Sequence, residues 1–408
     1  MEADASLSVA STDWGAQGVP GFYRPVVRSF AKRFLLGRLR YRLPNGVEGI
    51  LVGREEGPEA AIEVRRWRAL RRLMFGGKLG FAEAYLEGDW FSPDLAKMIE
   101  LMSANGIRQE DYNASLRWSR WVDQLRHHLR RNNRSGSRKN IQFHYDLGNE
   151  FYELWLDPSM TYSSAVYRPD AADLQQAQHH KYDRILELIA AKPGEHVLEI
   201  GCGWGGFARR AAAAGLKVTG ITLSTQQHAY AIKRAQDLGL SDRLSFHLCD
   251  YRDVAGTFDH AVSIEMIEAV GEAYWPQYFR KIADVVRPGG RIALQAITVR
   301  DEGFDQYRRR ADFIQTYIFP GGMLPCLKAL QDVSSRVGLH WLGDDGFGQH
   351  YAKTLEEWRK NFYAAWPRIR SLGFDEKFRR IWEFYLAGCE GSFRAGGIDV
   401  RQIALVRR

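Results

Sequence analysis

The sequence has few cysteines and no long hydrophobic run. A membrane-spanning helix needs about 20 consecutive apolar residues, and no stretch of the 408 residues approaches this. The amino terminus also lacks the basic and apolar regions of a secretory signal. Cys202, Cys249, Cys326 and Cys389 lie far apart without a C-x-x-C pair, so neither a zinc site nor a disulfide framework is indicated. These absences predict a cytoplasmic protein with reduced thiols.

The positive charge is concentrated in the first third of the chain. The net charge is +8. Residues 1–139 contain 24 Lys and Arg against 16 Asp and Glu, whereas residues 140–408 contain 33 of each. Such an asymmetry predicts an anionic partner for the amino-terminal part, either nucleic acid or a membrane surface rich in anionic lipid.

The amino-terminal part is expected to form a small basic α+β domain over residues 21–130, after a disordered lead-in at 1–20. Between Pro25 and Arg40, apolar residues recur at helical spacing with basic residues between them, which predicts a basic amphipathic helix. A hairpin should follow around the turn at 44–46, and then a strand and helix within 62–87.

A second basic amphipathic helix is predicted at Leu116–Arg131, followed by a polar linker at 131–140. The two basic helices are consistent with contact to a membrane surface. The alternative is that their apolar stripes pack on the domain's own core and their arginines face solvent.

The most informative motif is VLEIGCGWGGFA, from Val197 to Ala208. An apolar run ends at Ile200, and the glycines that follow let the backbone turn sharply and approach a ligand. Strands and helices then alternate from residue 196 to residue 298. This alternation predicts an α/β, doubly wound Rossmann-like domain over 141–408, with ligands at the carboxyl ends of its parallel strands.

The residues at the other strand ends do not match a nicotinamide-dinucleotide site. The second strand ends in Thr222, Leu223 and Ser224, where such sites commonly carry an acidic residue. The third ends in Asp250 and Tyr251, which offer a hydrogen-bond acceptor and an aromatic face to an adenine ring.

At this point the chain resembles the class I S-adenosylmethionine-dependent methyltransferases, and more narrowly the cyclopropane fatty acid synthase family, which includes the mycolic acid cyclopropane synthases. The amino-terminal GFAEAYLEGDW (80–90) is similar to the family's lipid-carrier-like domain. Blocks in family order cover most of residues 140–395: HYDLGNEFYELWLDPSMTYSSAVY (144–167), LEIGCGWGGFA (198–208), TLSTQQ (222–227), DYRD (250–253), SIEMIEAVGE (263–272), YIFPGGMLP (317–325) and FYLAGCEGSFR (384–394).

The resemblance implies both a cofactor site and a catalytic site. Glu268 matches the family's essential glutamate and Tyr385 its bicarbonate-contacting tyrosine, while Ser164 and Ile297 match residues that offer backbone N–H groups. Gln295 can donate a side-chain N–H to the same bicarbonate. Residues predicted to bind S-adenosylmethionine, from the resemblance or from their place at the strand ends, are Tyr162, Ser163, Gly201, Gly203, Gly205, Thr222, Ser224, Gln227, Asp250 and Tyr251.

The implied function is methylene transfer from S-adenosylmethionine to the cis double bond of unsaturated acyl chains in membrane phospholipids. Methyl transfer leaves a carbocation, which aromatic faces stabilise and from which water must be excluded. In the family, a bound bicarbonate then removes a proton and the cyclopropane ring closes. The resemblance also implies a location at the inner membrane surface, no metal, and a homodimer.

Three departures from the best-known members bear on ring closure. This chain has Ser164 where they have Cys, Ala269 where they have His, and Gln295 where they have His. Gln295 cannot titrate as an imidazole does. If the proton is lost from a neighbouring carbon, the product is a methylene- or methyl-branched chain instead.

Two other functions compete with this interpretation. A nucleic acid methyltransferase would explain the basic amino-terminal part, but the Asn/Asp-Pro-Pro-aromatic motif of amino-directed enzymes is absent because the sequence contains no Pro-Pro. A Pro-Cys pair is typical of cytosine-C5 methyltransferases. Here, however, Pro325–Cys326 follows the fifth strand and belongs to the lipid-family block that begins YIFPGGMLP, so a nucleic acid partner is not expected. A non-catalytic lipid-binding protein is disfavoured by the intact glycines and Glu268.

Overall fold

The computed structural model describes residues 18–106, 147–309 and 312–408. They divide into two compact units: residues 18–106 with Arg380–Ala395, and residues 147–379 with Gly396–Arg408. Each unit is described separately below. The second basic helix and the linker predicted from the sequence, and most of the lead-in, lie outside the described residues.

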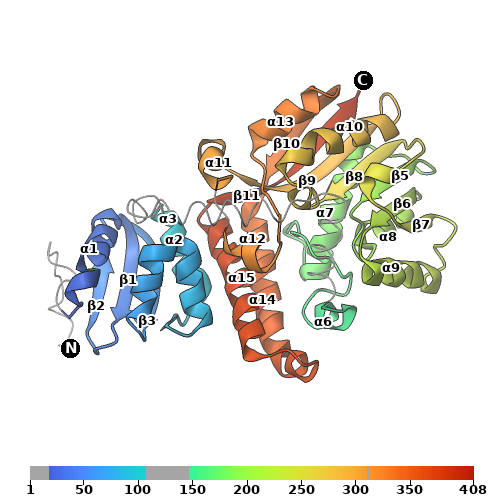
Figure 1. Ribbon diagram of the computed structural model, residues 1–408. Coiled ribbons are helices and arrows are strands. Elements are labelled where there is room, and N and C mark those ends of the chain that lie inside the picture. Colours follow the sequence, from blue (N-terminus) through green and yellow to red (C-terminus); the bar gives the residue numbers. More distant parts are fainter. Residues whose placement is uncertain (1–17, 107–146, 310–311) are drawn as a thin grey trace. The chain divides into compact units, whose positions relative to one another are not determined.

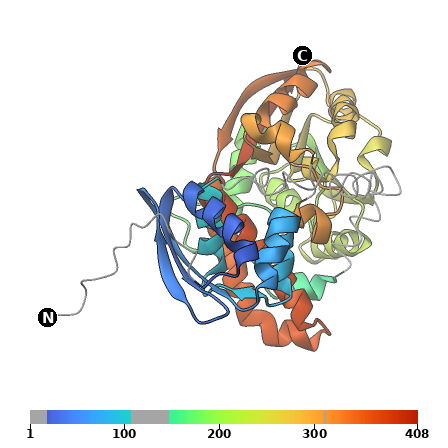
Figure 2. The same cartoon turned by 60° about the vertical axis from the view of Figure 1, so that its left-hand side comes forward.

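The first unit contains a four-stranded sheet in the order β2-β1-β3-β4 (Figure 2, blue). The predicted hairpin is confirmed, because β1 pairs antiparallel with β2 across the turn at 44–46. Strand β3 pairs parallel with β1 and antiparallel with β4. The strands are β1 Leu36–Arg42, β2 Glu48–Val52, β3 Glu55–Val64 and β4 Trp90–Phe91; the helices are η1 Gly21–Tyr23, α1 Arg24–Arg33, α2 Arg68–Leu86 and α3 Leu95–Ala104.

The prediction of one helix from Pro25 to Arg40 was wrong. Helix α1 ends at Arg33, and β1 begins at Leu36. Within β1, Leu39 is buried while Arg38 and Arg40 on either side are exposed, which is the two-residue period of a strand. The order of basic and apolar residues is compatible with the period of a helix and with that of a strand. Residues 36–42 form a strand because they pair with β2 and β3.

The second unit contains the predicted doubly wound sheet, in the order β10-β11-β9-β8-β5-β6-β7 (Figure 1). The central strands from β9 to β7 are parallel, and β11 is antiparallel to both β9 and β10. The strands are β5 His196–Ile200, β6 Lys217–Thr222, β7 Leu244–Leu248, β8 His260–Ile264, β9 Arg291–Val299, β10 Leu339–Gly346 and β11 Ile398–Arg407.

Helices cover both faces of this sheet because its central strands are apolar on both sides. Along β5, Leu198 and Ile200 pack in one cluster with α10 and α13, and Val197 packs in another with α7, α8 and α9. The helices are α6 Asn149–Glu153, α7 Leu174–Ile189, α8 Gly206–Ala213, α9 Thr225–Asp237, η3 Tyr251–Asp253, η4 Ile267–Ala269, η5 Glu272–Tyr274, α10 Trp275–Val285, α11 Asp301–Tyr307, α12 Phe313–Tyr317, α13 Leu327–Ser335, α14 Gly348–Ser371 and α15 Glu376–Arg394.

Most of helix α15 belongs to the first unit, although the sequence placed all of 141–408 in the catalytic domain. The Tyr85 hydroxyl donates to Glu383 Oε2 at 3.0 Å. A Cβ on Gly391 would lie 2.5 Å from the carbonyl oxygen of Ala96, so the helix backbone packs closely on α3. Residues 380–394 of α15 thus form part of the first unit. Within the described residues, no helix combines the length and the apolar character that crossing a bilayer requires.

Candidate functional site

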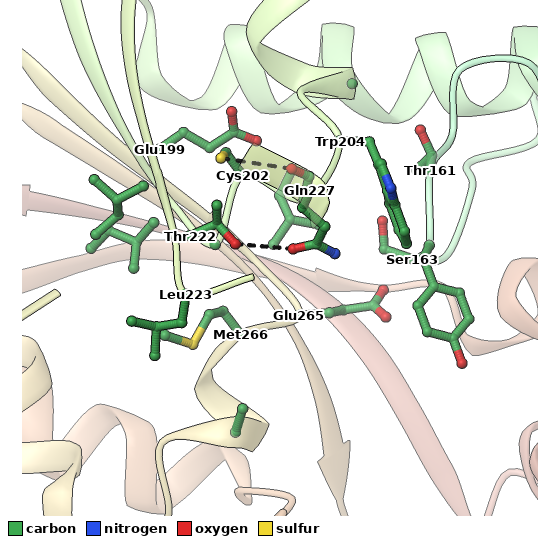
Figure 3. Close-up of a pocket in the computed structure, with 18 of the residues that line it drawn as sticks. Thr161, Ser163, Glu199, Cys202, Trp204, Thr222, Leu223, Gln227, Glu265 and Met266 are labelled. Carbon is green, nitrogen blue, oxygen red and sulfur yellow. Dashed lines mark hydrogen bonds between the residues drawn. The ribbon is translucent and has the colours of Figure 1, made fainter. Parts of the chain in front are cut away.

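A pocket lies where β5, β6 and β8 end (Figure 3). This is the expected position for a ligand of a doubly wound sheet. Gly206 at the start of α8 and Ala269 in η4 also line it. Of the ten residues predicted to bind the cofactor, seven line this pocket: Tyr162, Ser163, Gly201, Gly203, Thr222, Gln227 and Tyr251.

The glycine-rich turn after β5 forms one wall of the pocket. Gly201 and Gly203 have φ of +80° and +53°, which disfavour other residues. A Cβ on Gly201 would lie 2.7 Å from Met266 Cγ, whereas one on Gly203 would meet no atom within 4 Å. The turn therefore leaves an open space beside Gly203, the glycine hollow, which a side chain at this position would fill.

Gly205, Ser224 and Asp250 do not line the pocket but shape its walls. Gly205, with φ +80°, is the N-cap of α8. Ser224 caps α9 by accepting from the Gln227 N–H at 3.3 Å. Asp250 caps η3 and pairs with Arg252 at 2.9 Å. The side chains of Ser224 and Asp250 are engaged by other residues of the chain, and Gly205 begins α8. These three residues therefore position the loops that carry the lining residues.

Two buried polar atoms at the pocket lack partners among the described residues. They are Glu199 Oε2 and the Tyr251 hydroxyl, and both residues line the pocket. A buried polar group without a hydrogen bond is costly and is typical of a ligand site. The glycine hollow and these two atoms fit S-adenosylmethionine. Glu199 is a site residue that the sequence did not predict, although an acid inside a buried apolar strand was a signal.

Burial raises the pKa of Glu199 to about 8. Below about pH 4.5 the carboxyl is protonated in both the folded and the unfolded chain. As the pH rises to about 8, only the unfolded chain ionises, so folding stability falls across this range.

We therefore expect Glu199→Gln to leave the melting temperature of the ligand-free protein within about 2 °C of the parent at pH 5. At pH 8.5 the variant should melt several degrees higher. Thermal unfolding followed by circular dichroism across this pH range checks the prediction. Glu187→Gln, at an exposed position of α7, is the control and should give no pH-dependent difference. A constant offset between Glu199→Gln and the parent would contradict the assigned burial effect.

A second group of polar residues surrounds two carboxylates, Glu265 and Glu268. Glu265 Oε1 accepts from the Ser164 N–H at 2.8 Å and from Gln295 Nε2 at 2.7 Å. Its Oε2 accepts from the Tyr351 hydroxyl at 2.6 Å. Glu265 also lines the pocket, and Figure 3 shows its side chain extending toward Ser163.

The two oxygens of the Glu268 carboxylate differ in their surroundings. Its Oε1 accepts from the Ile297 N–H at 2.6 Å, and Oε2 is buried with no partner among the described residues. Burial, and then the charge of Glu265, raise the pKa of Glu268 to about 8. The structure thus brings together four predicted catalytic residues: Ser164, Glu268, Gln295 and Ile297. Tyr385 lies on the part of α15 that belongs to the other unit, so its role remains a prediction.

The bicarbonate implied by the resemblance does not fit this arrangement. The Ser164 N–H and Gln295 Nε2 donate to Glu265, and the Ile297 N–H donates to Glu268. Gln295 is further fixed because its Oε1 accepts from Gln402 Nε2 at 3.0 Å. A bicarbonate ion here would find these donors already engaged by Glu265 and Glu268. Among the described residues, no group of acidic, histidine or cysteine side chains is arranged to hold a metal ion.

Comparison with known proteins gives consistent matches. Residues 132–403 match the family model for mycolic acid cyclopropane synthetase. The chain is 40% identical over 370 residues to the tuberculostearic acid methyltransferase of Mycobacterium tuberculosis, covering 88% of this chain and 86% of that protein. It is 33% identical over 365 residues to the cyclopropane-fatty-acyl-phospholipid synthase of Escherichia coli, covering 85% of this chain and 88% of the relative.

The chain also resembles solved structures. A mycolic acid cyclopropane synthase complexed with SAH and CTAB is 31% identical, with a TM-score of 0.62. The match covers 66% of this chain and 98% of that chain.

Proposed function

This chain belongs to the mycolic acid cyclopropane synthetase family of S-adenosylmethionine-dependent methyltransferases, and we propose that it methylates the double bond of unsaturated fatty acyl chains. The observation that supports this most directly is the pocket at the ends of β5, β6 and β8. Its glycine hollow and its unpartnered buried oxygens fit the cofactor.

Several residues have defined tasks in this proposal. Gly201 and Gly203 let the backbone approach the cofactor. The Glu199 carboxyl offers an unpartnered oxygen to the ligand, and Tyr251 offers an aromatic face and a hydroxyl. The Thr222 hydroxyl donates to Gln227 Oε1 at 3.0 Å, which orients the Gln227 amide at the pocket wall (Figure 3).

An aromatic wall suits the cationic intermediate of alkene methylation. S-adenosylmethionine supplies an electrophilic methyl group, and its transfer to an alkene leaves a carbocation. Tyr162 lines the pocket and packs on Trp358, with ring centroids 5.2 Å apart, and on Tyr152 at 5.6 Å. Aromatic faces attract cations, and their apolar surface excludes water that would otherwise trap the intermediate.

We propose acyl chains of membrane phospholipids as the substrate and cyclopropane fatty acids as the product. The Escherichia coli relative is named for this activity. A methylene- or methyl-branched product is the second candidate. Two observations favour it: Gln295 stands where the best-known members have histidine, and the relative at 40% identity is named a methyltransferase.

Mass spectrometry of lipid fatty acids, from cells that lack their own synthase and express this chain, tests both candidates. A gain of one CH₂ that survives mild hydrogenation as a ring identifies a cyclopropane. The same gain on a methylene branch, which hydrogenation reduces, identifies the second candidate. No gain would contradict the proposed function and direct attention to cofactor binding and other substrates.

We also propose that the first unit binds an anionic membrane surface at the inner face of the membrane. Its residues 18–106 contain 15 Lys and Arg against 10 Asp and Glu. On β1 and β2, exposed Arg38 and Arg40 pair in register with Val52 and Ile50, which are 60% and 46% exposed. Apolar side chains between arginines suit an interface where lipid tails and anionic headgroups meet.

We therefore expect the double substitution Ile50→Asp and Val52→Asp to weaken binding to phosphatidylglycerol vesicles at least tenfold. Binding of the parent should also fall severalfold between about 50 and 500 mM salt, because screening weakens the attraction of the arginines. Vesicle sedimentation measures both effects. Leu342→Asp, at a position 51% exposed on β10, is the control. Equal binding of the double variant and the parent would contradict this surface.

A further inference from the structure

Two of the donors that the family resemblance assigns to a bicarbonate ion, Ser164 and Gln295, donate to a carboxylate of the chain, that of Glu265. Oε1 of Glu265 receives the Ser164 N–H and a Gln295 amide hydrogen, and Oε2 receives the Tyr351 hydroxyl hydrogen. These donors come from the loop before α7, from β9 and from α14. Three segments far apart in the sequence therefore hold one side chain in place.

The backbone at Glu265 is unusual. Glu265 follows directly after β8 and has φ +50°, in the left-handed region that side chains other than glycine rarely adopt. Its N–H donates to the Gln295 carbonyl oxygen at 2.7 Å, which holds this conformation. Such strain clusters at functional sites. Here it directs the carboxylate along the wall of the cofactor pocket.

Two opposing influences act on the ionisation of Glu265. Three hydrogen-bond donors and the charge of buried Lys181 stabilise the anion. Burial raises the pKa of Glu265 and is the larger influence. A carboxylate that is partly desolvated but remains ionised is a stronger base than one in water.

We propose that the Glu265 carboxylate, in place of a bound bicarbonate ion, removes the proton that completes the reaction. This inference rests on the proposed function, because it concerns the carbocation formed by methylation of an alkene.

The alkene π pair forms the bond to the methyl carbon, the carbon–sulfur pair stays on S-adenosylhomocysteine, and the second alkene carbon becomes cationic. A Glu265 oxygen takes a proton from the new methyl group. The C–H pair then closes the ring onto the cationic carbon. If a hydride first moves from the methylated carbon to its cationic neighbour, the same pair forms a methylene double bond. Glu265 later releases the proton to solvent.

The first test measures wild-type turnover with unsaturated phospholipid vesicles in buffer purged of carbon dioxide and then supplemented with bicarbonate. We expect the rates to agree within twofold. A loss of at least tenfold on purging, restored by bicarbonate, would overturn the proposal.

The second test compares Glu265→Gln with Glu265→Gly. Glutamine can still accept from Ser164 and Gln295, but it cannot take the proton. Glycine tolerates positive φ and leaves the donors free for an added anion. Both variants should lose turnover at least 100-fold and bind S-adenosylhomocysteine within threefold of the wild type. Bicarbonate should restore part of the turnover, saturably, in Glu265→Gly and none in Glu265→Gln.

The outcomes separate the two proposals. If the wild-type protein yields no methylated lipid, the proposed function fails, and this inference fails with it. If the wild type methylates lipid and Glu265→Gln keeps at least a tenth of its turnover, only the assignment of Glu265 as the base is overturned. If both variants lose cofactor affinity in parallel with turnover, Glu265 has a structural role, and the assignment is again overturned.

Discussion

Glu268→Gln is expected to lower turnover at least 100-fold while the affinity for S-adenosylhomocysteine stays within about threefold. Glu268 Oε1 is held by the Ile297 N–H, and Oε2 is buried without a partner among the described residues. An anion about 5 Å from a carbocation stabilises it by about 3 kcal/mol at an effective dielectric constant of about 20. That free energy corresponds to a factor of about 100 in rate, and glutamine removes the charge.

The pH dependence gives a second readout on Glu268. Because its pKa is raised to about 8, the carboxyl is mostly protonated at neutral pH and ionises as the pH increases. Turnover of the wild type should therefore rise with pH through about 8, and the residual turnover of Glu268→Gln should lack this rise. Steady-state assays from pH 6 to pH 9.5 measure it.

Glu272→Gln is the control for Glu268→Gln. Glu272 lies four residues further along and forms a partly exposed ion pair with Arg308 at 3.1 Å. Its loss should change turnover less than twofold. A parallel loss of turnover and of cofactor affinity in Glu268→Gln would refute the catalytic role and indicate a structural one.

Gly201→Ala is expected to weaken S-adenosylhomocysteine binding about 10- to 100-fold. With φ +80°, alanine at this position would be strained, and its Cβ would press on Met266 Cγ at 2.7 Å and Met266 Cβ at 3.2 Å. Both Gly201 and Met266 line the pocket, so any adjustment changes the wall that the cofactor contacts. Isothermal titration calorimetry measures the loss.

Gly289→Ala separates the backbone effect from the collision. Gly289 has φ +78°, nearly that of Gly201, but its Cβ would approach nothing closer than Arg287 Nη1 at 3.9 Å. Both substitutions should cost about 1 kcal/mol of folding stability through the left-handed backbone. Only Gly201→Ala should lose cofactor affinity. Equal affinities in the two variants would show that the turn does not contact the cofactor.

The central strands and helices of the second unit were predictable from the sequence because the residue patterns that indicate them are local. Strands β5, β6 and β8 and helices α8 and α9 lie within residues 196–298, where the sequence predicts that strands and helices alternate. The buried runs and the glycine turn specify these elements without reference to distant residues. By contrast, residues 34–40 fit helix and strand equally, and only the neighbouring strands decide between them.

The sequence by itself determined the family, the α/β fold and seven of the residues that line the pocket at the strand ends, because these depend on periodicity and on motifs at strand ends. Only the tertiary structure showed that Ser164, Gln295 and Tyr351 surround Glu265, and that most of α15 belongs to the first unit. Glu265 lies three residues before Glu268 in SIEMIEAVGE, and nothing in that segment distinguishes it from a solvated acid. The residues that donate hydrogen bonds to it are distant in the sequence. Ser164 lies 101 positions before Glu265, Gln295 lies 30 positions after it, and Tyr351 lies 86 positions after it. Which hydrogen bonds a carboxylate receives is a property of how separate segments pack, and no local pattern encodes it.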